Sequence, residues 1–289
     1  MADTALPIAP LTTTPPSLCS SAALESQAPA ARGARRRLAV RLARDADDLD
    51  AVQRLRWQVF FAEMGAGLQP DPTAPTDQRD ADPFDPLCDH LLVTDEGANG
   101  EEIVVGTYRL LRESVARAHG GFYSAGEFDI SVLTRREDPR ELLELGRSCV
   151  LPAYRTSATI QLLWRGIGEY LTAHSIALMF GCASFPGTDP RRFAEALSYL
   201  HHHHLAAPEA RPRVHPGKGV AMDMLALGSF DERQAQMQLP PLVKGYLRAG
   251  ARLGEGAYID HDFNTIDVCV VMPVELISLR YTARFGYAA

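Results

Sequence analysis

A glutamate and an arginine stand three residues apart in an apolar segment near the middle of the chain. They are Glu144 and Arg147, with Gly146 between them, in the segment 142–151. Residues three apart on a flat strand point to opposite faces, but a bulge at the glycine would turn both side chains to one side. Held together, they could orient a substrate, or the glutamate could accept a proton from an attacking amine. The other interpretation is a partly buried ion pair that serves only stability.

The turn after this segment is suited to bind an anion. It contains Arg155, Thr156 and Ser157, immediately before residues with helical periodicity. Thr156 or Ser157 is a suitable N-cap, and a helix N-terminus carries a partial positive charge to which Arg155 adds a full one. Ordinary capping accounts for the hydroxyls but not for the arginine. The turn has no glycine-rich phosphate motif, so the sequence does not indicate a nucleoside triphosphate.

Other polar residues were weighed as metal ligands or as nucleophiles. The runs 201–204, four histidines, and 260–262, Asp-His-Asp, lack the spacing that completes a metal site, and we predict no metal. Cys149 lies on the same segment as Glu144. A buried cysteine on an apolar strand is usually inert, and no histidine is placed by the sequence to activate it.

Two more arginines lie in segments with apolar character. Arg56 belongs to a helix that also contains Phe60, and Arg109 lies in the apolar strand VVGTYRLL. By default Arg56 is a charge on the helix surface. Arg109 needs a partner or a ligand, because an unpaired buried charge is costly.

The spacing of apolar residues predicts the elements that position these side chains. Strands are predicted at 38–42, 90–94, 102–111, 142–151 and 176–185, with a long strand or hairpin at 257–272. Helices are predicted from 45–48 to 65, from about 157 to 174 with Ile160, Leu163 and Ile167 on the buried stripe, at 190–205 and at 240–253. Segment 69–86 holds so many prolines and aspartates that it must be a loop. Together these elements predict a mixed α/β (α+β) fold with a strand–helix–strand unit at its centre.

Composition limits the class of protein. The chain has 289 residues, of which 46% are hydrophobic, and a net charge of −7. This length can bury a sizeable core, and the acidic balance argues against a nucleic-acid binder. The sequence has no apolar run of about 18 residues, so no membrane span is predicted. Five scattered cysteines fit reduced thiols in the cytoplasm.

The N-terminal segment differs from the rest. Residues 1–34 are rich in Pro, Ala, Ser and Thr and lack the apolar core of a secretory signal, so we expect a disordered tail. Four arginines between positions 32 and 37 are either a solvated linker or a contact with anionic lipid. Residues 35–289 are expected to form one domain with a C-terminal extension from about residue 206.

Several separated motifs occur in an order that resembles a known family. R-x-x-V-F lies on the first helix, the acidic loop ends in F-D and D-H, and V-G-x-x-R-L-L precedes E-L-G-R-S-C-V-x-P-x-Y-R. The order resembles GNAT-superfamily acyltransferases that use acyl carrier protein, and within them the ornithine N-acyltransferases that make lyso-ornithine lipid. Acyl-homoserine-lactone synthases are more distant. The resemblance covers about residues 38–285, includes LSYLHHHHL and DHDFNTIDVCVVMPVELI, and implies a GNAT-like fold with a mixed central sheet flanked by helices.

The resemblance also implies roles for residues at matching positions. Glu144 and Arg147 are expected to be catalytic. The residues expected to bind substrate are Arg56, Phe60, Asp85, Asp89 and Arg109, with the two aspartates holding the cationic side chain. The residues expected to bind phosphopantetheine are Cys149, Val150, Leu151, Arg155, Thr156 and Ser157. An aromatic residue expected shortly after the first helix is missing, and Ala66 and Leu68 occupy that stretch.

The implied reaction is direct aminolysis of a thioester, with no bound cofactor. The α-amine of L-ornithine would attack a 3-hydroxyacyl chain carried by acyl carrier protein, and Glu144 would accept the proton. Local arginines would meet the acidic carrier. A separate O-acyltransferase would act on the product, and the protein would work in the cytoplasm, in contact with the inner membrane surface. Two alternatives stay open: another amine such as homoserine or glycine as acceptor, and a non-catalytic protein that only binds a carrier.

Overall fold

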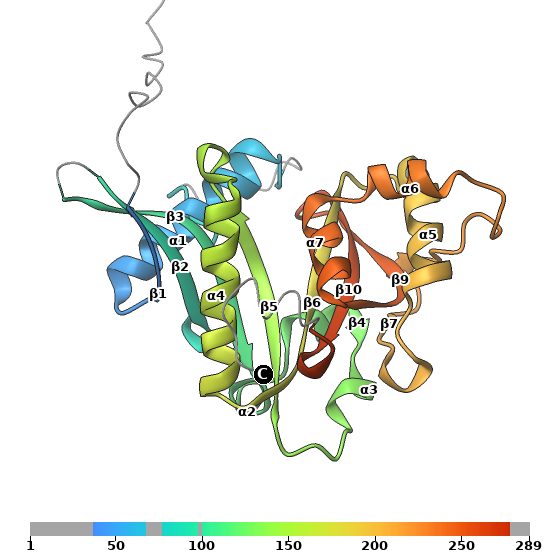
Figure 1. The fold of residues 1–289 in the computed structure, drawn as a ribbon, viewed down its shortest axis with the longest axis horizontal. Coiled ribbons are helices and arrows are strands. Elements are labelled where there is room, and N and C mark those ends of the chain that lie inside the picture. The colour runs from blue at the N-terminus through green and yellow to red at the C-terminus, as the bar shows by residue number, and fades with distance from the viewer. Residues whose placement is uncertain (1–36, 68–76, 98–99, 278–289) are drawn as a thin grey trace, which may run out of the picture. The chain divides into compact units, whose positions relative to one another are not determined.

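A mixed ten-stranded sheet forms the centre of the protein (Figure 1). The computed structural model describes residues 37–67, 77–97 and 100–277. The predicted tail at 1–34 lies outside the described residues, as does most of the first half of the proline-rich loop. The strand order is β1-β2-β3-β5-β6-β10-β9-β7-β4, with β8 paired to β9.

The strands that carry the candidate site are the long ones. Their bounds are β1 Leu38–Leu42, β2 Asp89–Glu96, β3 Glu102–Arg112, β5 Glu141–Val150, β6 Ile176–Pro186, β9 Arg252–Asp260 and β10 Thr265–Pro273. The short strands are β4 Phe128–Asp129, β7 Arg213–Val214 and β8 Gly219–Val220. The predicted hairpin at 90–111 is confirmed as β2 and β3, and the segment 257–272 belongs to the β9–β10 hairpin.

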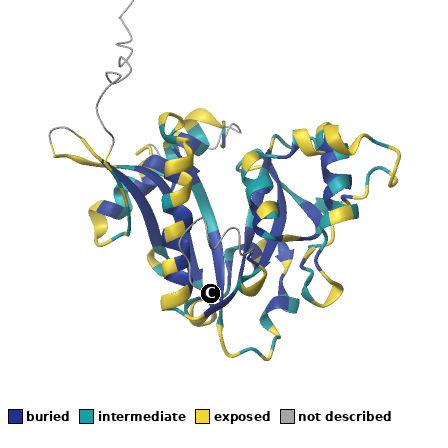
Figure 2. Cartoon of the chain, in the orientation of Figure 1, coloured by how far each residue is buried: buried dark blue, intermediate teal, exposed yellow. Residues whose placement is uncertain are grey.

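Helices pack on both faces of this sheet. The α-helices are α1 Ala46–Trp57, α2 Glu113–Ala118, α3 Ser131–Thr134, α4 Ser157–Ala173, α5 Ala194–His204, α6 Glu232–Gln238 and α7 Pro241–Ala249. A π-helix, η1 Gln58–Glu63, continues α1, and one of the short 3-10 turns, η3, spans Tyr123–Gly126. Neighbouring residues of β5 show the two faces, because Cys149 packs with α1 whereas Val150 packs with the core under α4. Figure 2 shows the sheet buried beneath these helices.

Two helix predictions differ from the structure in detail. Leu163 and Ile167 are buried on the predicted stripe of α4, but Ile160 is 42% exposed and Thr159 is buried in its place. The helix expected over 240–253 ends at Ala249, because Gly250 adopts a left-handed conformation with φ of 105° and stops it. The chain then enters β9, which leaves only nine residues for the helix.

The central feature of the sheet is the point where β5 and β6 separate. They pair in parallel only as far as Glu144 and Phe180. Beyond that point β5 continues along β3 and β6 continues along β10, and the two strands diverge in Figure 1. Gly181 follows the last pair, and a Cβ atom there would lie 2.1 Å from the carbonyl oxygen of Leu145. Only glycine therefore fits where the strands part.

A bulge in β5 lies just beyond this split. The pairing of β3 with β5 shifts between Thr107 and Arg109, and Arg147 has φ of 48°, in the left-handed region. The bulge that Gly146 predicted is therefore present, with the unusual backbone conformation at the arginine itself.

Candidate active site

Glu144 and Arg147 lie on one side of the sheet. Leu143 and Leu145 pack into the core under α4, so Glu144 points to the opposite face, and the bulge turns Arg147 to that same face. Both side chains meet Tyr123 of η3: its backbone N–H donates to Glu144 Oε2 at 2.9 Å, and its ring centroid lies 5.0 Å from Arg147 Cζ. The two charged groups thus share one surface next to the split.

Glu144 is held as a buried acceptor rather than as half of an ion pair. Its carboxylate accepts backbone N–H groups from Tyr123 at 2.9 Å and Ser124 at 2.6 Å. Burial raises the pKa of Glu144, and the hydrogen bonds from Ser124 oppose that rise. A carboxylate with raised proton affinity, fixed by rigid backbone donors, is suited to accept a proton from a substrate.

Arg147 belongs to a network of three arginines and three aspartates. Its guanidinium reaches Asp80 at 3.1 Å and Asp82 at 3.0 Å, so the predicted alternative of a Glu144–Arg147 ion pair is wrong. The remaining pairs are Arg56–Asp80 and Arg56–Asp85, both at 2.7 Å, and Arg109–Asp82 at 2.6 Å and Arg109–Asp85 at 3.1 Å. Positive and negative charges are equal in number, so the network is balanced within the chain.

The network corrects the expectation for Arg56. Its side chain is fully buried and is not a surface charge. Arg109 has the partners that its apolar strand required. Burial acts to raise the pKa of Asp85, but the hydrogen bond and charge of Arg56 outweigh it and hold the pKa well below its usual value. Asp80 and Asp82 come from the acidic loop. No local sequence pattern indicates that their partners are the network arginines.

Aromatic rings pack around the arginines. Arg147 Cζ lies 4.3 Å from the ring centroid of Phe263, and Arg109 Cζ lies 5.7 Å from that of Phe84. Phe60 of the π-helix packs edge-on against Phe263 at 6.0 Å between centroids. The structure therefore brings Phe60, Arg56, Arg109, Asp85 and the Glu144–Arg147 pair into one region.

Asp89 is the one predicted substrate contact that lies elsewhere. It accepts a 2.5 Å hydrogen bond from the Tyr170 hydroxyl of α4 and lies 3.7 Å from Arg112. Since α4 covers the opposite face of the sheet, Asp89 does not join the other predicted residues.

The start of α4 has the expected N-cap, but Arg155 beside it is already paired with a carboxylate of the chain. Thr156 is the N-cap and accepts from the backbone N–H of Thr159. Arg155 makes two hydrogen bonds to the Glu63 carboxylate, at 2.6 and 2.7 Å, and its Nε donates to the carbonyl of Val150 at 3.0 Å. Arg155 thus joins the end of β5 to the π-helix and remains 45% exposed.

The strand end expected to hold the pantetheine arm is mostly paired with β3. Cys149 is registered with Thr107, and the Leu151 N–H donates to the carbonyl of Val105. Burial raises the pKa of Cys149 to about 12, which fits its predicted role as inert packing.

The split between β5 and β6 is nearly closed in this structure. A cavity of about 10 Å³ remains there, lined by residues that include Leu145, Gly181 and Tyr246. The hydroxyl of Tyr246 on α7 lies 3.1 Å from that of Tyr108 on β3, so a side-chain contact spans the two halves of the sheet.

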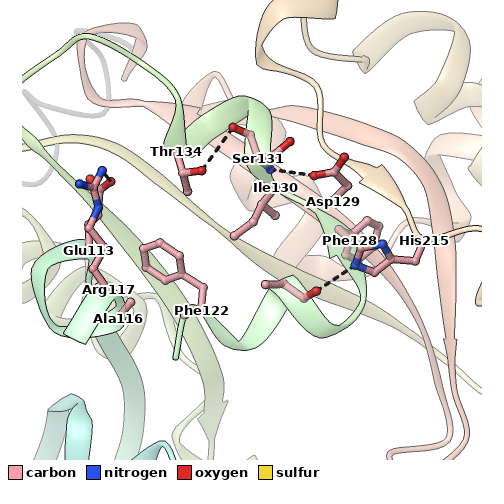
Figure 3. A pocket seen from close by; sticks show the side chains of 12 residues that line it. Glu113, Ala116, Arg117, Phe122, Phe128, Asp129, Ile130, Ser131, Thr134 and His215 are labelled. Atoms are coloured by element: carbon pink, nitrogen blue, oxygen red, sulfur yellow. Dashed lines mark hydrogen bonds and ion pairs between the residues drawn. The ribbon is translucent and has the colours of Figure 1, made fainter. Parts of the chain in front are cut away.

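A second hollow of about 470 Å³ lies beside the site, between α2, η3, α3 and His215 (Figure 3). Phe122, Phe128 and Ile130 form apolar walls. The Ser131 N–H donates to Asp129, and His215 Nε2 lies 2.9 Å from the carbonyl of Ala125. The hollow shares the 122–131 segment with the site.

Metal-ligating residues gather at one place among the described residues. Glu127, Asp260 and Asp267 each have an oxygen within 4.8 Å of the others. The four histidines do not gather in this way: His202 contacts the carbonyl of Leu225, and His203 contacts Glu232.

Comparison with known proteins identifies close relatives. The model of the acetyltransferase (GNAT) domain matches residues 55–165. An L-ornithine N(alpha)-acyltransferase from Agrobacterium fabrum is 48% identical over 251 residues, which cover 86% of this chain and 85% of that protein. Proteins of the same name from Rhizobium meliloti and Rhodobacter capsulatus are 47% and 43% identical, covering 86% and 84% of this chain and 84% and 92% of theirs.

Solved structures with a similar chain path have low sequence identity. The acyl-homoserine-lactone synthase LasI has a TM-score of 0.49 at 15% identity, covering 88% of this chain and 98% of its own. The N-acyl amino acid synthase FeeM has a TM-score of 0.44 at 10% identity, covering 86% and 99%.

Proposed function

This chain belongs to the L-ornithine N(alpha)-acyltransferase family, and we propose that it transfers a 3-hydroxyacyl chain from acyl carrier protein to the α-amine of L-ornithine. The product is lyso-ornithine lipid. High identity to proteins of that name over most of both chains supports the reaction. The observation in this structure that carries the mechanism is that the side chains of Glu144 and Arg147 lie on the same face of the sheet, next to the β5–β6 split.

The acyl donor is a thioester. Beyond Glu144, β5 has no partner strand on its β6 side in the described part of the chain. Apart from the Val150 carbonyl, which accepts from Arg155, we assign the peptide groups on that edge to an extended tether that enters as the split widens. The strand leads from Glu144 towards the capped start of α4, a path of about 20 Å. Arg155 and the helix start supply positive charge at its end. We assign this end to the phosphate of phosphopantetheine.

The chemical step is aminolysis without a covalent enzyme intermediate. The neutral α-amine attacks the thioester carbonyl carbon, and its proton passes to the Glu144 carboxylate, directly or through water. The tetrahedral oxyanion accepts hydrogen bonds from backbone N–H groups on the open edge of β5. The C–S bond then breaks, the thiolate takes up a proton, and the amide and the free carrier thiol are released. Arg147 and Arg109 orient the ornithine carboxylate, which shares their several N–H donors with Asp80, Asp82 and Asp85.

Acyl carrier protein, rather than coenzyme A, is the proposed carrier. The start of α4 lacks a glycine-rich turn, and a single arginine there suits one phosphate better than a nucleotide pyrophosphate. None of the described helices is long and apolar enough to cross a membrane. We propose that the product leaves for the inner membrane surface, where a separate O-acyltransferase adds a second chain.

The experiment incubates the purified chain with 3-hydroxyacyl carrier protein and a panel of amino acids. Acylation confined to ornithine supports the proposal. Acylation of homoserine or glycine in its place supports the other acceptors. Carrier binding without turnover of any amine supports a non-catalytic carrier-binding protein. Replacing the carrier by 3-hydroxyacyl coenzyme A tests the donor, for which we expect a much lower kcat/KM.

A further inference from the structure

We propose that Glu127, Asp260 and Asp267 form the subsite that binds the δ-ammonium of L-ornithine and so select a diamino acid as the acyl acceptor. This inference rests on the proposed function and assigns the part of the site that recognises the substrate side chain. The three residues, called here the carboxylate triad, come from the end of η3, from β9 and from β10.

The triad differs from the arginine network in its charge. Three carboxylates lie within 4.8 Å of one another, and the groups that donate hydrogen bonds to Glu127 and Asp260 in the described residues are neutral. Cys182 Sγ donates to Glu127 Oε2 at 2.9 Å, and the backbone N–H groups of Asp262 and Phe263 donate to Asp260 Oδ1 at 2.8 Å. The arginine network is balanced three to three, whereas no described arginine or lysine makes an ion pair with the triad, and Arg147 acts on Asp267 only through its charge.

One acceptor in the triad is left without a partner. Asp267 is 5% exposed, and its Oδ1 makes no hydrogen bond. A buried oxygen without a hydrogen bond costs free energy of folding. We therefore expect a ligand to supply the missing donor. A cation with N–H donors would both balance the negative charge of the triad and donate a hydrogen bond to Asp267 Oδ1.

The geometry matches an ammonium group. Because the three oxygens lie within 4.8 Å of one another, there is a point no more than about 2.8 Å from each of them, within the length of a charge-assisted N–H···O bond. An alkylammonium has three N–H donors and no acceptor. Three carboxylates from three elements therefore complement one –NH₃⁺ group.

The triad lies on the correct face and next to the proposed base. On β10, Val268 and Val270 pack into the core cluster that also holds Leu143 and Leu145 of β5, so Asp267 points to the opposite face, the one that bears Glu144. The η3 turn connects them: the Ser124 N–H donates to Glu144, and Cys182 lies between the Ser124 hydroxyl and Glu127. Four carbons separate the two amines of ornithine, so one can reach Glu144 while the other enters the triad.

The other predicted carboxylates are less suited to this task. Asp85 is already paired with Arg56 and Arg109, and Asp89 lies on the opposite face with Tyr170 and Arg112. A substrate ammonium would have to displace an arginine from Asp85. We therefore assign the side-chain ammonium to the triad in their place.

The test compares L-ornithine with L-norvaline, which has the same carbon chain without the δ-amine. The intact chain is assayed with 3-hydroxyacyl carrier protein as wild type, Asp267→Asn and Glu127→Gln. Asp262→Asn is the matched control, since Asp262 is an exposed carboxylate two residues from Asp260. We expect wild type and control to prefer ornithine by at least about 100-fold in kcat/KM. We expect Asp267→Asn and Glu127→Gln to lose about 10–100-fold with ornithine and less than about threefold with norvaline.

Other outcomes overturn the inference. An unchanged ornithine-to-norvaline ratio in both variants, or an equal loss with both substrates, gives the triad a structural role only. Activity that chelators abolish and Mg²⁺ or Ca²⁺ restores, in wild type but not in Asp267→Asn, makes the triad a metal site. Calorimetric titration with ornithine and norvaline measures the same preference as binding. If no ornithine is acylated at all, the proposed function fails, whereas the titration still decides the subsite. Thermal unfolding checks that each variant folds.

Discussion

Glu144 and Arg147 meet the same turn, η3, although they are three positions apart on β5. Glu144 accepts the N–H of Tyr123, and the Arg147 guanidinium lies over the ring of that residue. The bulge at Arg147, with its left-handed backbone, is what makes this possible. A regular strand would point the arginine to the α4 face, away from the glutamate.

Replacing Glu144 by glutamine should lower kcat by about 10²–10⁴-fold, because the amide cannot accept the proton of the attacking amine. The variant should also lose about 1–3 kcal/mol of stability, since the new NH₂ group opposes one of the two backbone N–H donors. Glu141→Gln is the control: Glu141 lies on the same strand and also accepts a backbone N–H, from Ser114. Steady-state kinetics, with unfolding followed in parallel, separates catalysis from folding. Equal activity in the two variants would remove Glu144 from the mechanism.

The split between β5 and β6 depends on Gly181. Gly181→Ala should destabilise the protein by several kcal/mol or abolish folding, because the new Cβ would lie 2.1 Å from the carbonyl oxygen of Leu145. Gly126→Ala is the matched control, since a Cβ there meets nothing within 4 Å. Urea unfolding of both variants measures the difference. A Gly181→Ala protein as stable as Gly126→Ala would show that the strands do not approach this closely.

Substitutions of Arg155 and Glu63 should change the KM for acyl carrier protein in opposite directions. The Glu63 carboxylate accepts two hydrogen bonds from the Arg155 guanidinium, the group that we assign to the phosphate, so glutamate and phosphate would compete for it. Arg155→Ala should raise the KM for acyl carrier protein about 5–20-fold, and Glu63→Gln should lower it, with the KM for ornithine unchanged in both. Arg54→Ala, which removes another exposed arginine paired with an aspartate, serves as the control. Shifts of the two KM values in the same direction would refute a competition between glutamate and phosphate.

Stability without substrate should fall as the pH rises. Burial raises the pKa of Glu127 from 4.5 to about 8 and that of Asp267 from 3.8 to about 6. Groups with a raised folded-state pKa contribute stability that is complete below the unfolded-state pKa and is lost as the pH rises through the folded value. The Tm should therefore fall between pH 5 and pH 8.5, by on the order of 5–10 °C.

The predicted loss of stability at higher pH should depend on the carboxylate triad. Glu144 and Arg147 on β5, Cys182 on β6, Tyr258 and Asp260 on β9 also face these two carboxyls. Asp267→Asn should flatten the lower part of the pH profile, and saturating ornithine should raise the Tm most above pH 8, where Glu127, with a pKa of about 8, is mostly ionised. A pH profile that ornithine leaves unchanged at every pH would argue against a cation site.

The sequence predicted what depends on local chemistry. Gly146 indicated the bulge, Thr156 the cap, and the apolar periods the β2–β3 hairpin and the helix after Ser157, all of which the structure contains. Local signals could not assign partners across long separations. Nothing near Arg147 indicates Asp80, and the triad joins residues 127, 260 and 267 through the β9–β10 hairpin and η3.

The central claim is tested most directly by mass spectrometry of lipids from cells that express this chain or its Glu144→Gln variant at equal soluble protein. We predict that a 3-hydroxyacyl amide of ornithine accumulates with the wild-type chain and is reduced at least about 100-fold with the variant. Equal amounts of that lipid from both chains, or acylation of a different amine by the wild type, would contradict the account.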